Sequence, residues 1–249
     1  MPHLSDLRVK LFTDGADKAQ ILEMAKQPWI AGFTTNPSLL KKAGVADYAA
    51  YGRDLVAAVP DRHISFEVFS DDIPEMVAQA RVIAAWGRNV FVKLPVTNTR
   101  GEALFEAVRS LSRDGVNINM TAIFTADQVA RAVDALAGGA PACVSVFAGR
   151  LADFGIDYRP IMRDAVARSR NTRNVEIIWA STREAFNVFE ADEMGCQIIT
   201  APADILKKLP AFGSKSAADL SLDAVKAFRA DAVAAGLTLE LAPRADAAE

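Results

Sequence analysis

Lys93 is the residue whose type and position most directly suggest chemistry. It lies in the otherwise apolar run Val90–Thr97, which is typical of a strand covered on both faces. An ammonium group in such surroundings loses its hydration and needs a polar partner. Desolvation also favours the neutral amine, which can attack a carbonyl carbon and form a Schiff base. Lys93 therefore indicates either a paired structural lysine or an imine-forming nucleophile.

Other polar residues fall at or near the carboxyl ends of the predicted strands. In a barrel of parallel strands these ends form one face, and barrel enzymes place their chemistry there. Asn119 and Thr121 are two residues apart in one strand, so they share a face. We therefore expect all of these side chains to converge on one rim. The set is Asp14, Asn36, Glu67, Lys93, Asn119, Thr121, Ser145 and Ser181, with Arg150 and Arg183 in the following loops and Thr200 as a weaker candidate on the eighth strand.

Each candidate also has an ordinary structural interpretation. Lys93 could be paired with Asp14 or Glu67, and Asp14 could cap the helix that follows it. Asn36, followed by proline, could form a plain strand-to-helix turn. The other candidates could be strand fillers, small spacers or surface arginines: Thr121, Ser145, Ser181, Arg150 and Arg183. The expected convergence on one rim is what favours a functional site.

Short apolar segments alternate with amphipathic helical segments along the chain. The predicted strands are residues 9–14, 30–36, 63–68, 89–95, 116–124, 142–147, 175–181 and 197–201. Helical segments lie between them, for example at residues 17–26, 73–86, 102–113, 126–137, 161–170, 183–193 and 203–209. This order predicts a (β/α)8 TIM barrel that forms a single domain over residues 1–249. A doubly wound open sheet is the alternative, weakened because no Gly-x-Gly-x-x-Gly follows the first strand.

An extra helix, at about residues 223–235, is predicted after the eight repeats, followed by a small charged tail at 242–249. The helix could close the outer wall of the barrel or dock on a neighbouring subunit.

Composition narrows the classes of partner. The chain has 249 residues, 51% of them hydrophobic, and a formal net charge of −3. The mixed charge gives no reason to expect nucleic acid or an anionic membrane as a partner. The first residues lack the apolar core of a signal peptide, and no apolar run is long enough to span a bilayer. Cys143 and Cys196 lie in apolar runs, which is typical of a reducing compartment. We expect a cytoplasmic protein.

The polar residues favour carbonyl chemistry. Histidine occurs only twice, and a zinc-dependent aldolase would need several. His3 lies near the amino terminus, and His63 begins the third predicted strand, at the opposite end of the barrel from the expected chemistry. Neither is therefore placed to act as the base of a serine triad. Carboxylates alone could still hold magnesium. What remains is an amine with carboxylates, which suits an imine mechanism. We expect no metal and no cofactor.

Several segments resemble signatures of the transaldolase family. Residues 32–40 (GFTTNPSLL) are similar to its first signature, and residues 92–97 (VKLPVT) are similar to the segment around its Schiff-base lysine. Further similarities occur in the family's order at residues 11–14 (LFTD), 119–124 (NMTAIF), 145–150 (SVFAGR) and 180–183 (ASTR). The resemblance covers nearly the whole chain. Short members of the family often assemble through the carboxy-terminal helix, so the resemblance also implies a homo-oligomer.

The resemblance implies a (β/α)8 barrel and a class I, metal-free mechanism. It implies transfer of a dihydroxyacetone unit from fructose 6-phosphate or sedoheptulose 7-phosphate to an aldose phosphate, as in the pentose phosphate pathway. Lys93 would form the imine, Glu67 would act through a water held with Thr121, and Asp14 would handle the proton of a donor hydroxyl. The implied substrate-binding residues are Asn36, Thr35, Asn119, Ser145 and Phe147, and the implied phosphate-binding residues are Arg150, Ser181 and Arg183.

Fructose-6-phosphate aldolase is a close relative in this family, and two positions separate the types. Aldolases of that kind resemble this chain but carry Gln at the position of Glu67 and Tyr at the position of Phe124. The Glu67 and Phe124 of this chain therefore favour a transferase. The chain departs from the family pattern at Phe33 and Val146 and by one extra residue before Gly101. Two alternatives to a transaldolase remain. The protein could be a lyase on the same scaffold, or an inactive barrel that only binds sugar phosphates.

Overall fold

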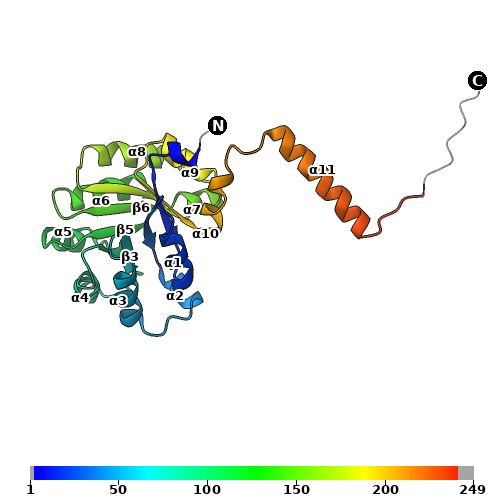
Figure 1. The fold of residues 1–249 in the computed structure, drawn as a ribbon. Coiled ribbons are helices and arrows are strands. Elements are labelled where there is room, and N and C mark those ends of the chain that lie inside the picture. Colours follow the sequence, from blue (N-terminus) through cyan, green and yellow to red (C-terminus); the bar gives the residue numbers. More distant parts are fainter. Residues whose placement is uncertain (1–2, 241–249) are drawn as a thin grey trace, which may run out of the picture.

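The computed structural model describes residues 3–240, and its centre is a closed barrel of parallel strands (Figure 1). The strands pair in chain order from β1 to β8, and β1 closes the barrel against β8. This confirms the predicted (β/α)8 barrel and shows that the doubly wound alternative is wrong. The strands are β1 (Lys10–Asp14), β2 (Ile30–Thr34), β3 (His63–Glu67), β4 (Val90–Pro95), β5 (Ile118–Ile123), β6 (Ala142–Val146), β7 (Val175–Trp179) and β8 (Ile198–Pro202).

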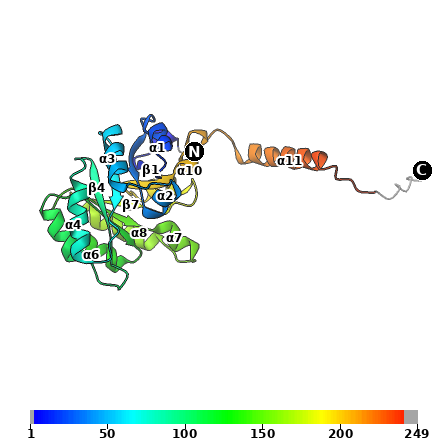
Figure 2. The same ribbon diagram turned by 90° about the horizontal axis from the view of Figure 1, so that it is seen from below.

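Helices follow the strands and surround the barrel (Figures 1 and 2). Several begin at an aspartate whose side chain accepts a hydrogen bond from the helix backbone, such as Asp17 from Gln20 N (2.7 Å). The structure also contains α2, α3 and α7, for which the sequence analysis gave no residue range. The α-helices around the barrel are α1 (Lys18–Ala25), α2 (Pro37–Lys42), α3 (Tyr48–Ala58), α4 (Ile73–Ala84), α5 (Phe105–Arg113), α6 (Ala126–Leu136), α7 (Ala148–Asp153), α8 (Arg159–Arg170), α9 (Asn187–Glu193) and α10 (Ala203–Leu206), and the 3₁₀ turns are η1 (Leu4–Asp6) and η2 (Leu209–Ala211).

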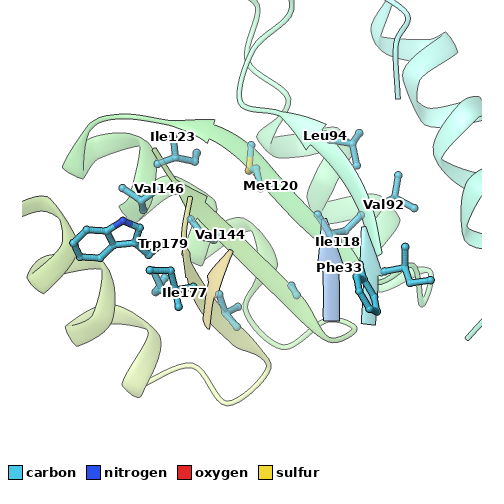
Figure 3. Packing of buried hydrophobic residues seen from close by; sticks show 14 of the residues in the cluster. Phe33, Val92, Leu94, Ile118, Met120, Ile123, Val144, Val146, Ile177 and Trp179 are labelled. Carbon is cyan, nitrogen blue, oxygen red and sulfur yellow. The ribbon is translucent and has the colours of Figure 1, made fainter. Parts of the chain in front are cut away.

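The core lies mainly between the strands and the surrounding helices. Figure 3 shows side chains of β4, β5, β6 and β7 packed in this layer, including Val92, Met120, Val144 and Trp179, all of which are buried. A smaller apolar cluster contains Phe12 and buried residues of β6, β7 and β8. The apolar character of the strands thus has a direct cause, since both of their faces are covered.

The extra carboxy-terminal helix, α11 (Ala217–Ala234), projects away from the barrel (Figures 1 and 2). It begins six residues earlier than predicted, because Ser216 and Asp219 form a reciprocal capping box. None of its residues is buried, so of the two alternatives for this helix, closure of the barrel wall is wrong. The predicted tail at 242–249 lies outside the described residues. Within residues 3–240, no helix combines the length and apolar composition needed to cross a membrane.

Candidate active site

A cavity of about 490 Å³ opens at the carboxyl ends of the strands. Most of the candidate residues line it, so the expected convergence on one rim is observed for them. Two candidates, Thr35 and Asn119, do not belong to its wall. The candidates that line it are Asp14, Asn36, Glu67, Lys93, Thr121, Ser145, Phe147, Arg150, Ser181 and Arg183, and Thr200 lines it as well.

Lys93 lies on β4 with 6% of its surface exposed. Its Nζ donates a hydrogen bond to the backbone oxygen of Thr35 (2.7 Å) and lies 3.1 Å from Glu67 Oε2. The register of β3 and β4 places Glu67 directly beside Lys93. The ion pair of Lys93 with Glu67, one of the alternatives left open by the sequence, is therefore present. A carboxylate at this distance also provides the base that an attacking amine requires, so the pair is compatible with both roles.

Asp14 ends β1 and lies beside two threonines. Thr34 Oγ1 donates to Asp14 Oδ1 (2.8 Å) and is also 2.6 Å from Thr200 Oγ1. Burial raises the pKa of Asp14 and the charge of Glu67 adds to this, although Lys93 and the Thr34 hydrogen bond act in the opposite direction. Asp14 is not a helix cap, because Asp17 caps α1. A carboxyl group with a raised pKa, placed in a cavity, suits proton transfer.

Asn36 has the structural role that its sequence context allowed, and it also lines the cavity. Its Oδ1 caps α2 by accepting from Leu39 N (3.0 Å), and Pro37 follows at the first helical position. The cap explains why β2 ends at Thr34, before the predicted strand end. The cap uses Oδ1 and leaves the Nδ2 group of Asn36 to donate to a ligand.

Thr121 presents an unsatisfied hydroxyl in the cavity wall. Its Oγ1 is buried and has no hydrogen-bond partner within residues 3–240. The next residue, Ala122, has a left-handed backbone with φ 59°, and the pairing of β5 with β6 shifts register here. Such a conformation costs free energy for a residue with a Cβ atom. A buried hydroxyl without a partner is suited to hold a water or a substrate hydroxyl.

The opposite side of the cavity is built from α7 and the end of β7. Ser181 has φ 65°, and its carbonyl oxygen would lie 1.6 Å from a Cβ atom on Gly149. Glycine is therefore required where α7 approaches the segment after β7 so closely. The guanidinium of Arg150 lies 5.1 Å from the centre of the Phe147 ring.

Arg183 forms a two-point ion pair with Asp153, a residue that the sequence analysis did not identify. Arg183 Nε lies 3.0 Å from Asp153 Oδ1, and Arg183 Nη2 lies 2.6 Å from Asp153 Oδ2. Hydrogen bonding from Arg183 lowers the pKa of Asp153, and the charge of Arg150 contributes to this. The pair leaves Nη1 and part of Nη2 as donors. The position of Asp153 three residues after Arg150 was the available sequence signal.

Thr35 and Asn119 lie beneath the cavity rather than in its wall. Thr35 Oγ1 donates to the backbone oxygen of Ser65 (2.9 Å), and the carbonyl of Thr35 holds Lys93. Asn119 is 0% exposed and contacts Ser65 and Ser145. Both residues therefore support side chains that reach the cavity.

The fold and the site together define a parallel α/β barrel with an amine, two carboxyl groups and two guanidinium groups around one cavity. Within the described residues, no group of three or more His, Cys, Asp or Glu side chains is placed to share a metal ion. Residues 11–241 match the family described as Transaldolase/Fructose-6-phosphate aldolase. The chain belongs to this family and is a transaldolase-family enzyme.

Curated relatives are similar over most of the chain. A "Probable transaldolase" of Dehalococcoides mccartyi is 36% identical over 202 residues, which cover 81% of this chain and 90% of the relative. A "Probable transaldolase" of Thermoanaerobacter sp. is 38% identical over 202 residues, which cover 81% of this chain and 89% of the relative.

Solved structures of low sequence identity share the fold alone. A crystal structure of 2,3-dimethylmalate lyase has a TM-score of 0.53 at 16% identity and covers 97% of this chain and 89% of that chain. A putative isomerase from Sinorhizobium meliloti has a TM-score of 0.56 at 15% identity, with 81% of this chain and 54% of that chain covered.

Proposed function

We propose that this protein is a transaldolase that moves a dihydroxyacetone unit from a ketose phosphate to an aldose phosphate in the pentose phosphate pathway. Fructose 6-phosphate or sedoheptulose 7-phosphate is the donor. The observation that carries the proposal is the amine of Lys93, which is buried in the cavity wall 3.1 Å from Glu67. Membership of the family and the names of the relatives support it.

In this proposal Lys93 attacks the C2 carbonyl of the donor after Glu67 removes a proton from its ammonium group. The carbinolamine then loses water, and a protonated imine forms between Lys93 and C2. Glu67 lies close enough to return that proton to the leaving hydroxyl, directly or through one water. The unsatisfied hydroxyl of Thr121 is the group that holds this water.

Asp14 controls the carbon–carbon bond. The C4 hydroxyl gives its proton to Asp14, the C3–C4 bond breaks, and its electrons enter the imine to form an enamine. An aldose is released and another enters. Carbon C3 then attacks the new aldehyde, whose oxygen takes the proton back from Asp14. The raised pKa of Asp14 supports its service as both base and acid. Hydrolysis of the imine frees the product and restores Lys93.

The remaining residues bind the sugar phosphate. Asn36 and Ser145, both in the cavity wall, contact hydroxyl groups of the dihydroxyacetone unit, while Thr35 and Asn119 hold the groups around them. Ser181, Arg150 and Arg183 bind the phosphate on the other side of the cavity, and Phe147 supports Arg150.

A coupled assay tests the proposal. Fructose 6-phosphate is incubated with each of a panel of aldose phosphates, and the products with and without acceptor are separated and quantified. A transaldolase forms a new ketose phosphate only when an acceptor is present, and Lys93→Met abolishes the reaction while keeping a similar volume. Free dihydroxyacetone released without acceptor would instead identify a lyase. Binding of the sugar phosphates without any turnover would contradict both.

We also propose that the protein is a cytoplasmic homo-oligomer in which α11 docks on a second copy. Exposed apolar side chains recur along α11, among them Leu222, Val225, Phe228 and Val233. Exposed aromatic side chains also occur on loops of the barrel, at Phe69, Phe154 and Phe186, so each copy offers an apolar surface to another. Light scattering should give an oligomer for the natural chain and a smaller species for Phe228→Asp. A monomeric natural chain at micromolar concentration would contradict this part of the proposal.

A further inference from the structure

A line of hydrogen bonds runs beneath the cavity from His63 to Ser145. His63 Nε2 lies 2.8 Å from Ser65 Oγ, and Asn119 Nδ2 donates to the same oxygen (3.0 Å). Ser145 Oγ then donates to Asn119 Oδ1 (2.7 Å). Of these four residues, Ser145 alone lines the cavity. The line thus connects the start of β3, at the far end of the barrel, with the cavity wall.

The imidazole at the start of this line packs against two aromatic rings, and its burial favours the neutral form. Its ring stacks on Phe91, with ring centres 3.7 Å apart and an angle of 10° between planes, and it meets the edge of Phe12 at 4.7 Å. Burial, with a smaller contribution from the charge of Lys10, lowers the pKa of His63 to about 3. A neutral imidazole has one nitrogen that accepts a hydrogen bond and one that donates.

Proton counting sets the direction of every bond once the role of His63 Nε2 is known. A serine hydroxyl carries one proton. If Nε2 accepts, Ser65 gives its proton to His63 and can only accept from Asn119. The amide must then turn Nδ2 towards Ser65 and Oδ1 towards Ser145. Ser145 gives its own proton to that oxygen, so it offers the cavity lone pairs only.

The other tautomer would remove this restriction. With a proton on Nε2, Ser65 keeps a proton that it can donate to Asn119 Oδ1. The amide can then turn over, and Ser145 becomes free to donate into the cavity. The observed arrangement, with Asn119 Nδ2 on Ser65, agrees with an accepting Nε2.

We propose that His63 is a positioning residue whose Nε2 lone pair, acting through Ser65 and Asn119, makes Ser145 an acceptor for a hydroxyl group of the substrate. An acceptor at this place favours a ligand with a hydroxyl proton over one with a carbonyl or phosphate oxygen there. The identity of that ligand as a dihydroxyacetone unit rests on the proposed function, whereas the polarity of the line does not.

Nitrogen-15 NMR of histidine-labelled protein tests the polarity in the unmodified chain. His63 and His3 are the two histidines, so His3→Ala assigns the spectrum. The expected result is a proton on Nδ1 and an unprotonated Nε2 for His63 between pH 5 and 8 (about 1.5 units either side of an ordinary histidine pKa). A proton on Nε2, or a doubly protonated ring in that range, would overturn the inference.

A double-mutant cycle tests the effect on the reaction. His63→Leu, which removes the acceptor, should lower kcat/KM roughly fivefold to tenfold, the effect of one hydrogen bond. His63→Gln, which offers an oxygen near the position of Nε2, should recover most of this loss. In a Ser145→Ala background His63→Leu should have no further effect, since the line no longer ends at a hydroxyl.

The outcomes separate this inference from the proposed function. Additive losses in the cycle, or equal losses for Leu and Gln, would show that His63 acts only in packing. Transfer activity combined with the wrong tautomer would overturn the inference and leave the proposed function intact. A natural chain without transfer activity would contradict the proposed function, and the NMR experiment would still decide the polarity.

Discussion

Gly149→Ala tests whether the contact of α7 with the segment after β7 builds the phosphate side of the cavity. An added Cβ would lie 1.6 Å from Ser181 O, and ordinary contact begins near 3.4 Å, so the backbones must separate by about 1.8 Å. Forcing such overpacking costs about 1–3 kcal/mol or more. At about 2–4 °C per kcal/mol for a chain of this size, we expect Tm to fall by roughly 2–12 °C. A displacement of about 1 Å at a binding site can cost about 100-fold in rate.

The assay compares kcat/KM for fructose 6-phosphate and for unphosphorylated dihydroxyacetone as donors, alongside thermal unfolding. Gly149→Ala should lower the value for the phosphorylated donor about 10-fold to 100-fold more than the value for dihydroxyacetone. Gly155→Ala is the matched control, because Gly155 has φ +72° but open space around its Cα. The control should lose stability through backbone strain without changing the preference for phosphate. If Gly149→Ala keeps the natural Tm and KM, the reasoning from this contact is refuted.

Three further changes address individual groups. Glu67→Gln should lower kcat by roughly 100-fold to 10,000-fold, because it removes the acid–base group beside Lys93. Steady-state transfer rates equal to those of the natural chain would show that Glu67 takes no part in the mechanism. The raised pKa of Asp14 means that its ionised form destabilises the fold, so stability is lost as pH rises above the ordinary value of 3.8 towards the raised pKa. Asp14→Asn should therefore abolish transfer and raise Tm at pH 7 relative to the natural chain, with a smaller difference in Tm below pH 3.8. An equal Tm difference at both pH values would contradict this. Arg183→Ala should raise KM for phosphorylated donors roughly 10-fold to 100-fold. Asp153→Ala should raise this KM less than about fivefold, because an exposed ion pair contributes little to the placement of Arg183. Equal effects of the two variants would show that Asp153 matters as much as Arg183.

The sequence predicts the barrel because both faces of its strands are apolar, and that property is visible in a single chain. The ends of the strands are less predictable, because local hydrogen bonds decide them. The predicted second strand ran to Asn36, but the side chain of Asn36 caps α2 and the strand ends at Thr34. The seventh ran to Ser181, whose left-handed backbone ends the extended conformation at Trp179. Helix α11 was placed too late because its apolar pattern becomes visible only after the capping box.

The candidate site was largely predictable from polar residues at strand ends. The sequence did not predict which of these residues line the cavity and which lie beneath it. Asn119 and Thr121 share a face of β5, yet only Thr121 reaches the cavity. Depth along the barrel depends on the stagger of the strands, which spacing in one strand does not reveal. The sequence analysis placed His63 at the far end of the barrel, and this is correct for its backbone. Its ring, however, reaches Ser65, which is hydrogen-bonded to Asn119 beneath the cavity.

The most direct measurement is to trap the intermediate on the natural enzyme. The protein is incubated with fructose 6-phosphate, reduced with borohydride and analysed by peptide mass spectrometry, with Lys93→Met as the control. The account predicts one sugar-derived adduct, on the peptide that contains Lys93, and none in the control. An adduct on another lysine, or no adduct on an enzyme that turns over its substrate, would contradict the account.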